Sequence, residues 1–335
     1  MAEAPSEHGI GIFGAGIWGT ALACAWARSG HRVALWGHTP AKMQDLAETR
    51  LHPRLATPLT GGVDPVADAR VALAAPIWIS CLPVQASAGA WRDLIAQASR
   101  RPALLLHSSK GLVSHTHHTV SQALEPLVDL PVGTLSGPTF ADEVAMGLPA
   151  ALVLAVPEAI TDYEAGQLQK GLATERLRLY LSRDVVGAEL CGALKNVLAI
   201  AAGLVEELGL GHNARAALIT RGLAEMARLV EARGGRPETV MGLAGMGDLM
   251  LTATGPQSRN RRLGAALAKG LSLKEAIDTL GGQVAEGVPT TRAALDLGRE
   301  AGVDLPITEA VARLLDGDSP ASAVDRLMNR NLKHE

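Results

Sequence analysis

The chain contains 335 residues, which is enough for two domains because a typical domain has roughly 100 to 200 residues. Its formal net charge is -3 and aromatic residues make up only 3% of it. These values exclude a broad basic surface for nucleic acids and the aromatic platforms on which single strands stack. With 47% hydrophobic and 19% charged residues, the composition is that of a globular protein.

The sequence carries no sign of export or of membrane insertion. Its first residues, MAEAPSEHG, lack the basic start and apolar core of a signal peptide, and no apolar run approaches the roughly 20 residues that span a bilayer. Cys24, Cys81 and Cys191 are widely separated in apolar surroundings and match neither a disulfide framework nor a metal-ligand spacing. We therefore expect a soluble, cytoplasmic protein without a metal site.

The amino-terminal region has the pattern of a dinucleotide-binding site. A strand, a glycine-rich turn, a helix and a second strand are expected in that order at residues 9–13, 14–19, 20–29 and 32–36. In this setting Gly14 makes the tight turn, Gly16 lets a pyrophosphate approach the backbone, and Gly19 permits close helix packing. The pyrophosphate is then expected at the positive end of the helix.

The end of the second strand bears on the choice of cofactor. NAD-selective sites place an acidic residue about 20 residues beyond the glycines, to bind the ribose hydroxyls. Here the chain reads Trp36-Gly37-His38-Thr39, with no acidic residue before Asp45. A missing carboxylate, with His38 as a possible donor to a 2′-phosphate, favours NADP or dual use. His38 is equally explained as an ordinary turn residue.

Further short apolar runs predict a larger sheet. Strands are expected at residues 77–81, 103–107, 132–135, 150–156 and 176–180. Helical segments separate several of them, which predicts an α/β, Rossmann-like, doubly wound sheet. The loops Ser108–Gly111 and Ser136–Ala141 follow two of these strands, where ligands of such sheets bind. Lys110 is therefore a candidate ammonium at the active site, and an exposed loop lysine is the alternative.

From about residue 183 the pattern becomes helical and predicts an all-α carboxyl-terminal domain. Helices are expected at residues 186–208, 212–233, 258–269, 272–280, 289–301, 306–316 and 320–330. Ser272 and Glu275 have the spacing of a capping box. The predicted domains are a dinucleotide-binding domain at residues 1–183 and a helical substrate-binding domain at residues 184–335.

Lys195 is the most unusual residue of the carboxyl-terminal half, because it lies within an otherwise apolar helix. It projects nearly opposite the main apolar stripe, among small residues: Ala188, Cys191, Gly192, Ala199 and Ala202. Desolvation disfavours a charged lysine, so an enclosed Lys195 would have a lowered pKa suited to proton transfer. The alternative is a surface lysine on a helix that packs closely through its small residues.

Two other motifs in this half predict binding of an anion. Ser258 has the position of an N-cap, which places Arg259 and Asn260 in the first helical turn, where backbone N–H groups, an amide and a guanidinium can bind phosphate. A solvated basic face or a salt-bridged helix start is the alternative. Asp248, after the glycine-rich GLAGMG, either orients a catalytic ammonium or simply caps the following helix.

Over almost its whole length, the chain resembles the soluble, bacterial-type NAD(P)-dependent glycerol-3-phosphate dehydrogenases. Seven blocks in the same order carry the resemblance: GIFGAGIWGTALA (11–23), SSKG (108–111), LSGPTFADEV (135–144), ELCGALKNVLAIAAG (189–203), NARAALITRGLAEM (213–226), GLAGMGDLMLTATGPQSRNRRLG (242–264) and VAEGVPTTRA (284–293). The chain departs from many relatives at Ala253 and Ala285, and at His38, where some relatives carry arginine.

The resemblance also implies the roles of individual residues. Lys195 would transfer the proton. Substrate contacts are implied at Lys110, Gly137, Thr139, Lys195, Asp248, Ser258, Arg259 and Asn260. Cofactor contacts are implied at Gly14, Gly16, Trp18, Gly19, His38, Lys110, Ala141, Arg259, Val284 and Glu286.

The implied reaction is reduction of dihydroxyacetone phosphate to sn-glycerol 3-phosphate by hydride transfer from NADPH or NADH, with NADPH favoured, for glycerophospholipid synthesis in a homodimer. Two alternatives remain: a 6-phosphogluconate-type or 3-hydroxyacyl-type dehydrogenase, and a non-catalytic sensor of the NADP redox state. The ordered SGPTFA and SRNRR blocks argue against the first alternative. Both lysines and the phosphate site argue against the second.

Overall fold

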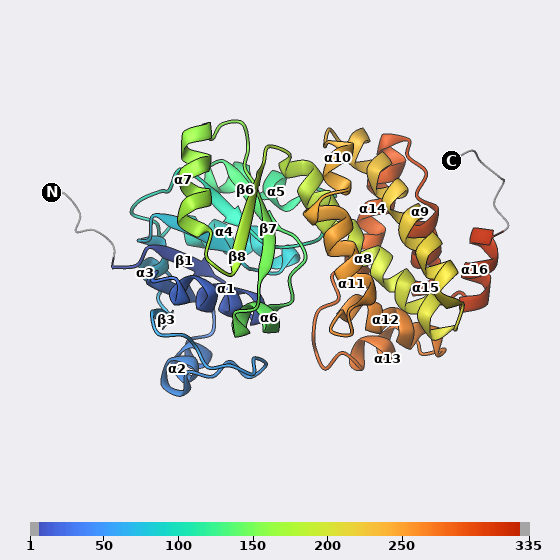
Figure 1. Cartoon of the computed structure of the whole chain (residues 1–335), viewed down its shortest axis with the longest axis horizontal. Coiled ribbons are helices and arrows are strands. Elements are labelled where there is room, and N and C mark those ends of the chain that lie inside the picture. The colour runs from blue at the N-terminus through green and yellow to red at the C-terminus, as the bar shows by residue number, and fades with distance from the viewer. Residues whose placement is uncertain (1–6, 329–335) are drawn as a thin grey trace. The chain divides into compact units, whose positions relative to one another are not determined.

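The structure is a computed structural model that describes residues 7–328, and these divide into two compact units (Figure 1). One unit comprises the described chain up to Ser109 together with Val120–Val185. The other comprises Lys110–Thr119 and the described chain from Val186 onward. The segment 110–119 thus packs with the helical unit although its neighbours on both sides belong to the first unit, an excursion that no pattern in the sequence predicts.

Among the described residues, the first unit is built on one eight-stranded sheet with the strand order β3-β2-β1-β4-β5-β6-β7-β8. The strands are β1 (Ile10–Phe13), β2 (Val33–Trp36), β3 (Val63–Val66), β4 (Ile77–Ser80), β5 (Leu105–His107), β6 (Val132–Ser136), β7 (Ala150–Ala155) and β8 (Leu177–Ser182). Neighbouring strands are parallel except β6 and β7, which are antiparallel. The predicted fold class is confirmed.

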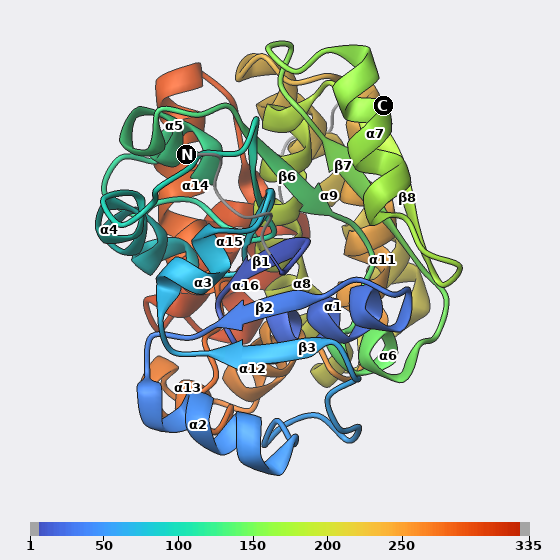
Figure 2. The ribbon, with the colours of Figure 1, turned by 90° about the vertical axis from the view of Figure 1, so that its left-hand side faces the viewer.

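Seven helices accompany this sheet within the described chain, and Figure 2 shows several of them against its strands. They are α1 (Ile17–Arg28), α2 (Pro40–Thr49), α3 (Ala69–Leu73), α4 (Val84–Ile95), α5 (Val120–Val128), α6 (Ala141–Met146) and α7 (Asp162–Leu172). An aromatic cluster anchors α4, because the Trp91 ring lies 4.8 Å from Phe13 of β1 and 5.8 Å from Trp78 of β4. Such pairs stabilise the core beyond the area they bury.

The strand β3 was not expected, because its sequence VDPV has two residues that are depleted in strands between its two valines. Asp64 is polar and Pro65 has no N–H to donate. The strand forms because β3 lies at the edge of the sheet and pairs only with β2, where proline is tolerated (Figure 2). Hydrogen bonding to β2 therefore outweighs the low strand propensity of Asp64 and Pro65.

The second unit is helical, as expected. Its helices are α8 (Val185–Glu207), α9 (Gly211–Ala232), α10 (Pro237–Val240), the π-helix η1 (Leu243–Gly247), α11 (Asp248–Thr254), α12 (Arg259–Ala268), α13 (Leu273–Asp278), α14 (Gly287–Ala301), α15 (Pro306–Leu315) and α16 (Pro320–Met328). The capping box of Ser272 and Glu275 at the start of α13 is confirmed. The last predicted helix ran to residue 330, and its final two residues lie outside the described chain.

The burial of helix α8 excludes the surface-lysine alternative, and its apolar length corrects one expectation. Its residues are buried on every side from position 187 to 205, so the helix has no solvent face opposite its apolar stripe. It is also long and apolar enough to cross a membrane by length and composition, whereas no such run was expected. Because 94% of its most apolar stretch is buried inside the protein, α8 is the core helix of the helical unit.

Small residues let other helices approach the backbone of α8. A Cβ atom on Gly203 of α8 would lie 1.9 Å from the carbonyl oxygen of Arg261, and one on Gly264 of α12 would lie 1.9 Å from that of Ile200. The two glycines therefore form a reciprocal backbone contact between α8 and α12. The sequence offered close packing through small residues as the alternative to an enclosed Lys195 ammonium. In the structure, α8 has both features.

Candidate functional site

The glycine-rich turn between β1 and α1 has the geometry that a dinucleotide requires. Gly14 has a positive φ of 119°, and a Cβ atom on Gly19 would lie 2.0 Å from the Gly14 carbonyl oxygen. By contrast, a Cβ atom on Gly16 would meet no atom within 4 Å. Gly14 and Gly19 are thus required by the turn itself, whereas Gly16 leaves the backbone at the start of α1 open. This open cradle fits a pyrophosphate.

The other predicted cofactor residues of the first unit, and two predicted substrate residues, lie at one edge of the sheet. Of the cofactor residues, His38 is exposed just beyond β2 and Ala141 begins α6. The predicted substrate residues Gly137 and Thr139 follow β6. Because β1, β2 and β6 share one direction, these residues lie at the same carboxyl edge as the glycine-rich turn. Trp18 is half-buried in the first turn of α1. This edge is where ligands bind in doubly wound sheets.

The chemistry of the helical unit centres on one carboxylate held between two ammonium groups. The Lys195 Nζ atom donates to Asp248 Oδ1 at 2.8 Å, and the Lys110 Nζ atom donates to Asp248 Oδ2 at 2.6 Å. Lys195 also donates to Thr252 Oγ1 at 2.8 Å. Asp248 is 1% exposed and Lys195 is 7% exposed. Lys195 is therefore not a surface lysine, and Lys110 is not a solvated loop lysine, because both are bound to the buried Asp248 carboxylate.

Burial and charge set the protonation of this group. Burial lowers the pKa of Lys195 to about 8, and the positive charges of Lys110 and Arg259 also lower it, against the opposing attraction of Asp248. For Asp248, burial acts to raise the pKa, but the two ammonium groups outweigh it and the pKa is lowered. Lys195 can therefore exchange a proton near neutral pH while Asp248 stays ionised.

A rare helix type delivers Asp248 to this position. The π-helix η1 covers Leu243–Gly247 and passes directly into α11, of which Asp248 is the first residue. A Cβ atom on Gly245 would lie 2.1 Å from the Val240 carbonyl oxygen, so only glycine fits there. Single-turn π-helices occur frequently at functional sites. The Asp248 carboxylate binds the two lysines instead of capping α11, which favours the orienting role over the capping role.

The start of α12 has the predicted phosphate-receptor form. Ser258 is the N-cap, and its Oγ atom accepts the Arg261 N–H at 3.2 Å. Arg259 is exposed as the first residue of the helix and is near enough to lower the pKa of Lys195. A guanidinium and a positive helix end therefore lie near the proposed proton donor.

Asn260 was expected to point its amide toward a bound phosphate, but its side chain is hydrogen-bonded within the protein. Its Oδ1 atom accepts the Gly287 N–H at 3.0 Å, and its Nδ2 atom donates to Asn196 Oδ1 at 2.9 Å. Asn196 Nδ2 in turn donates to the Lys110 carbonyl oxygen at 3.1 Å. This network ties α14, α12 and α8 to the backbone beside Lys110. Asn196 was not assigned a role from the sequence, although a polar residue beside Lys195 in an apolar helix was a usable signal.

The last two predicted cofactor residues lie just before α14. Val284 is 52% exposed, and Glu286 immediately precedes Gly287, the first residue of α14. Glu286 is therefore one residue from the N–H group that Asn260 binds. Together with Lys110 and Arg259, both residues belong to the helical unit.

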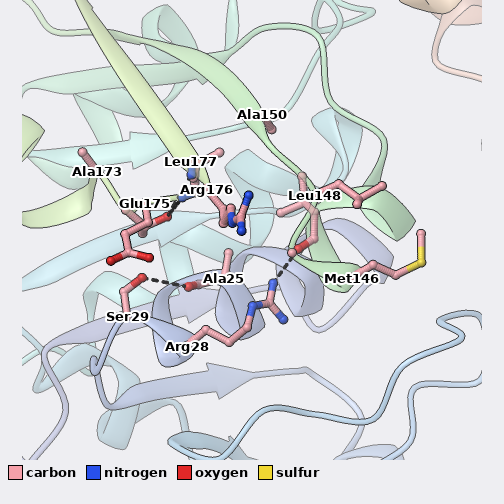
Figure 3. A pocket seen from close by; sticks show the side chains of 13 residues that line it. Ala25, Arg28, Ser29, Met146, Leu148, Ala150, Ala173, Glu175, Arg176 and Leu177 are labelled. Carbon is pink, nitrogen blue, oxygen red and sulfur yellow. Dashed lines mark hydrogen bonds between the residues drawn. The ribbon is translucent and has the colours of Figure 1, made fainter.

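A cavity of ≈ 670 Å³ lies elsewhere, in the first unit (Figure 3). Arg28 lines it and donates to the carbonyl oxygens of Val144 and Ala145 at 2.6 and 2.7 Å, which closes the end of α6. None of the predicted site residues lines this cavity. It adjoins the carboxyl end of α1, whereas the glycine-rich turn lies at the amino end.

Comparison with known proteins gives one consistent assignment. The family profiles described as NAD-dependent glycerol-3-phosphate dehydrogenase N-terminus and C-terminus match residues 9–161 and 184–325. The chain is 46% identical to glycerol-3-phosphate dehydrogenase [NAD(P)+] from Thioalkalivibrio sulfidiphilus, with 98% of this chain and 99% of the relative covered. It is 47% identical to the enzyme of the same name from Thiobacillus denitrificans, with 97% and 98% covered.

The solved structures agree with the sequence relatives. The crystal structure of glycerol-3-phosphate dehydrogenase from Coxiella burnetii shares 37% identity and a TM-score of 0.90, over 97% of this chain and 100% of that chain. A ketopantoate reductase from Ralstonia eutropha, at 18% identity and a TM-score of 0.59, shares the fold alone. The predicted resemblance is confirmed, and the matches do not favour the other dehydrogenase types weighed above. The chain belongs to the NAD(P)-dependent glycerol-3-phosphate dehydrogenases, a family of oxidoreductases.

Proposed function

We propose that this chain reduces dihydroxyacetone phosphate to sn-glycerol 3-phosphate with NADPH or NADH, and that Lys195 supplies the proton. The observation that carries the proposal is the buried Lys195 ammonium, bound to Asp248 at 2.8 Å and with a pKa lowered by burial to about 8. An ammonium of this acidity can protonate an alkoxide and still be reprotonated by water near neutral pH.

The cofactor, when bound at the glycine-rich turn, supplies the hydride that reduces the C2 carbonyl. Gly14, Gly16, Gly19 and the start of α1 would hold its pyrophosphate. Trp18, His38, Ala141, Val284 and Glu286 are the further cofactor residues proposed from the family. His38 can donate to a 2′-phosphate, so we propose that both cofactors are accepted and that NADPH is preferred in the reductive direction.

Negative charge develops on the C2 oxygen as the carbonyl is reduced, and Lys195 stabilises it and then donates the proton from Nζ. In the oxidative direction, neutral Lys195 accepts the proton of the C2 hydroxyl group. Asp248 fixes the Lys195 ammonium through Oδ1 and holds Lys110 through Oδ2. Lys110 adds positive charge beside the reacting oxygen and lowers the pKa of Lys195.

The phosphate group is proposed to bind at the start of α12. Arg259 supplies a fixed charge there, Ser258 shapes the first turn, and the backbone N–H groups provide donors. Asn260 supports this turn through its bonds to Gly287 and Asn196. Gly137 and Thr139 complete the proposed substrate contacts. Binding the distant phosphate positions C2 for reaction.

The test is the rate of NADPH oxidation at 340 nm with dihydroxyacetone phosphate, for Lys195→Ala and for the control Lys269→Ala. Lys269 is an exposed lysine of the same unit that pairs with Glu207. Lys195→Ala should lower kcat by about a hundredfold or more and leave NADPH binding unchanged, as expected for loss of a general acid. A rate near that of the wild type would remove Lys195 from the mechanism. Parallel rates with NADH measure the cofactor preference.

We also propose that the enzyme works in the cytoplasm as a homodimer and supplies glycerophospholipid synthesis, without membrane insertion or nucleic-acid binding. The family supports this proposal, together with the modest net charge of -3. Light scattering of the purified protein tests the dimer: a mass near 34.8 kDa would indicate a monomer.

A further inference from the structure

Residues near both ends of the segment 110–119 contact helices of the helical unit. At its beginning, Lys110 binds Asp248 through its side chain and Asn196 through its carbonyl oxygen. At its other end, the ring of His117 lies against α14. The segment carries one of the two lysines of the site, so its attachment affects where that lysine lies.

His117 lies between two carboxylates of one helix. Its Nδ1 atom is 3.2 Å from Glu300 Oε1, and its Nε2 atom is 3.3 Å from Asp296 Oδ2. Asp296 and Glu300 are four residues apart on α14, so both face the same side of that helix. The His117 side chain is 21% exposed.

The backbone of the segment fixes the direction of this ring. The Val113 N–H donates to the His118 carbonyl oxygen at 3.0 Å, and the His117 N–H donates to the Val113 carbonyl oxygen at 2.9 Å. His117 itself has a positive φ of 57°, a conformation that few residues other than glycine adopt. A closed turn thus presents the imidazole to α14.

Only the protonated ring suits both neighbours. An ionised carboxylate accepts hydrogen bonds and donates none, and a neutral imidazole has a single N–H group. With a neutral ring, one nitrogen lone pair would therefore face a carboxylate oxygen. The imidazolium has a proton on each nitrogen and a charge that attracts both carboxylates.

Two arginines contact the same carboxylates but use their other oxygens. Arg299 Nη2 lies 2.9 Å from Asp296 Oδ1, and Arg233 Nη1, just beyond the end of α9, lies 3.8 Å from Glu300 Oε2. Their charges weaken the attraction of the ring to the carboxylates but leave Asp296 Oδ2 and Glu300 Oε1 for His117. The described charged groups facing the ring from other elements are thus two acids from α14, with these arginines behind them.

We propose that His117 is a positioning residue that fastens the segment 110–119 to α14 and thereby holds Lys110 against Asp248. The consequence for catalysis rests on the proposed function, in which Lys110 contacts the substrate. The attachment itself does not depend on that function.

The first test compares KM and kcat for dihydroxyacetone phosphate at a single pH of 7 in the wild type, His117→Gln and the control His115→Gln. Glutamine cannot carry a positive charge, and His115 is an exposed histidine of the same turn. His117→Gln should raise KM about fivefold, the scale of two partly exposed ion pairs, with little change in kcat. His115→Gln should follow the wild type. An unchanged KM in His117→Gln, or an equal rise in His115→Gln, overturns the proposal.

The second test reads the attachment without activity. Hydrogen exchange of the peptide containing residues 110–119, corrected for intrinsic rates, should be slower in the wild type than in His117→Gln. The double variant Asp296→Asn with Glu300→Gln should abolish the effect of His117→Gln. If the exchange difference appears but the wild type does not reduce dihydroxyacetone phosphate, the proposed function fails and the attachment stands. If the exchange is the same in all variants, the attachment fails.

Discussion

Replacing Asp248 with asparagine tests the central charge arrangement most directly. The change keeps the shape of the side chain but removes the negative charge that both the Lys110 and the Lys195 ammonium groups bind. A lysine with a pKa of about 8 instead of 10.5 already holds its proton less favourably by about 3 kcal/mol, and this value includes the attraction of Asp248. Removal of the carboxylate should therefore cost about 3 to 5 kcal/mol of unfolding free energy at pH 7.

Urea unfolding followed by circular dichroism measures this cost, with Asp316→Asn as the matched control. Asp316 also pairs with a cation, Arg292, but both side chains are more than half exposed, so its loss should cost at most about 1 kcal/mol. The cost of Asp248→Asn should shrink as the pH rises above about 8, because a neutral Lys195 needs no counter charge. If both variants cost the same at pH 7, the buried charge arrangement described above is wrong.

Three further predictions address the cofactor turn, the proton donor and the core. Gly16→Ala should weaken NADPH binding but leave the melting temperature unchanged. Gly19→Ala should weaken binding and also lower the melting temperature, because a Cβ atom on residue 19 would lie 2.0 Å from the Gly14 carbonyl oxygen. Fluorescence titration measures the binding and thermal unfolding measures the melting temperature. As the pH rises through about 8, the rate of dihydroxyacetone phosphate reduction should fall and the rate of glycerol 3-phosphate oxidation should rise. Reduction needs protonated Lys195, whereas oxidation needs the neutral amine. If both rates rise or both fall, Lys195 is not the proton donor. Glu225→Ala should lower the unfolding free energy measured in urea by about 2 to 4 kcal/mol, because Glu225 accepts the N–H groups of Ile307 and Thr308 at the start of α15. Glu231 lies on α9 like Glu225 but is exposed, so Glu231→Ala should change the unfolding free energy little.

Local patterns were sufficient to predict much of the fold. Most strands of the sheet are short and rich in apolar residues, so β1, β2 and β4 to β8 could be located from composition. The capping residues Ser258 and Ser272 marked helix starts. The strand β3 could not be predicted, because VDPV pairs only through the neighbour it meets after folding. The excursion of segment 110–119 into the helical unit depends equally on tertiary contacts.

The site was predictable where a residue type conflicted with its surroundings. A lysine in an apolar helix and an aspartate after a glycine run were both visible, and they meet at 2.8 Å. The link from Asn260 through Asn196 to Lys110 was not predictable, because three segments far apart in the sequence supply it. The same is true of His117, whose carboxylate partners lie about 180 residues further along the chain.

The glycine contact between α8 and α12 has a consequence for which sugar phosphates the proposed site can accept. Gly203 and Gly264 let the two backbones approach so closely that a side chain on either glycine would clash with the other helix. Lys195 lies on one of these helices and Arg259 begins the other, so we expect this contact to fix the spacing between the amine and the guanidinium. Under the proposed function, a three-carbon ketone phosphate spans a set length, and a longer homologue would carry its carbonyl past the amine. We therefore expect two residues without side chains, outside the proposed site, to favour short substrates.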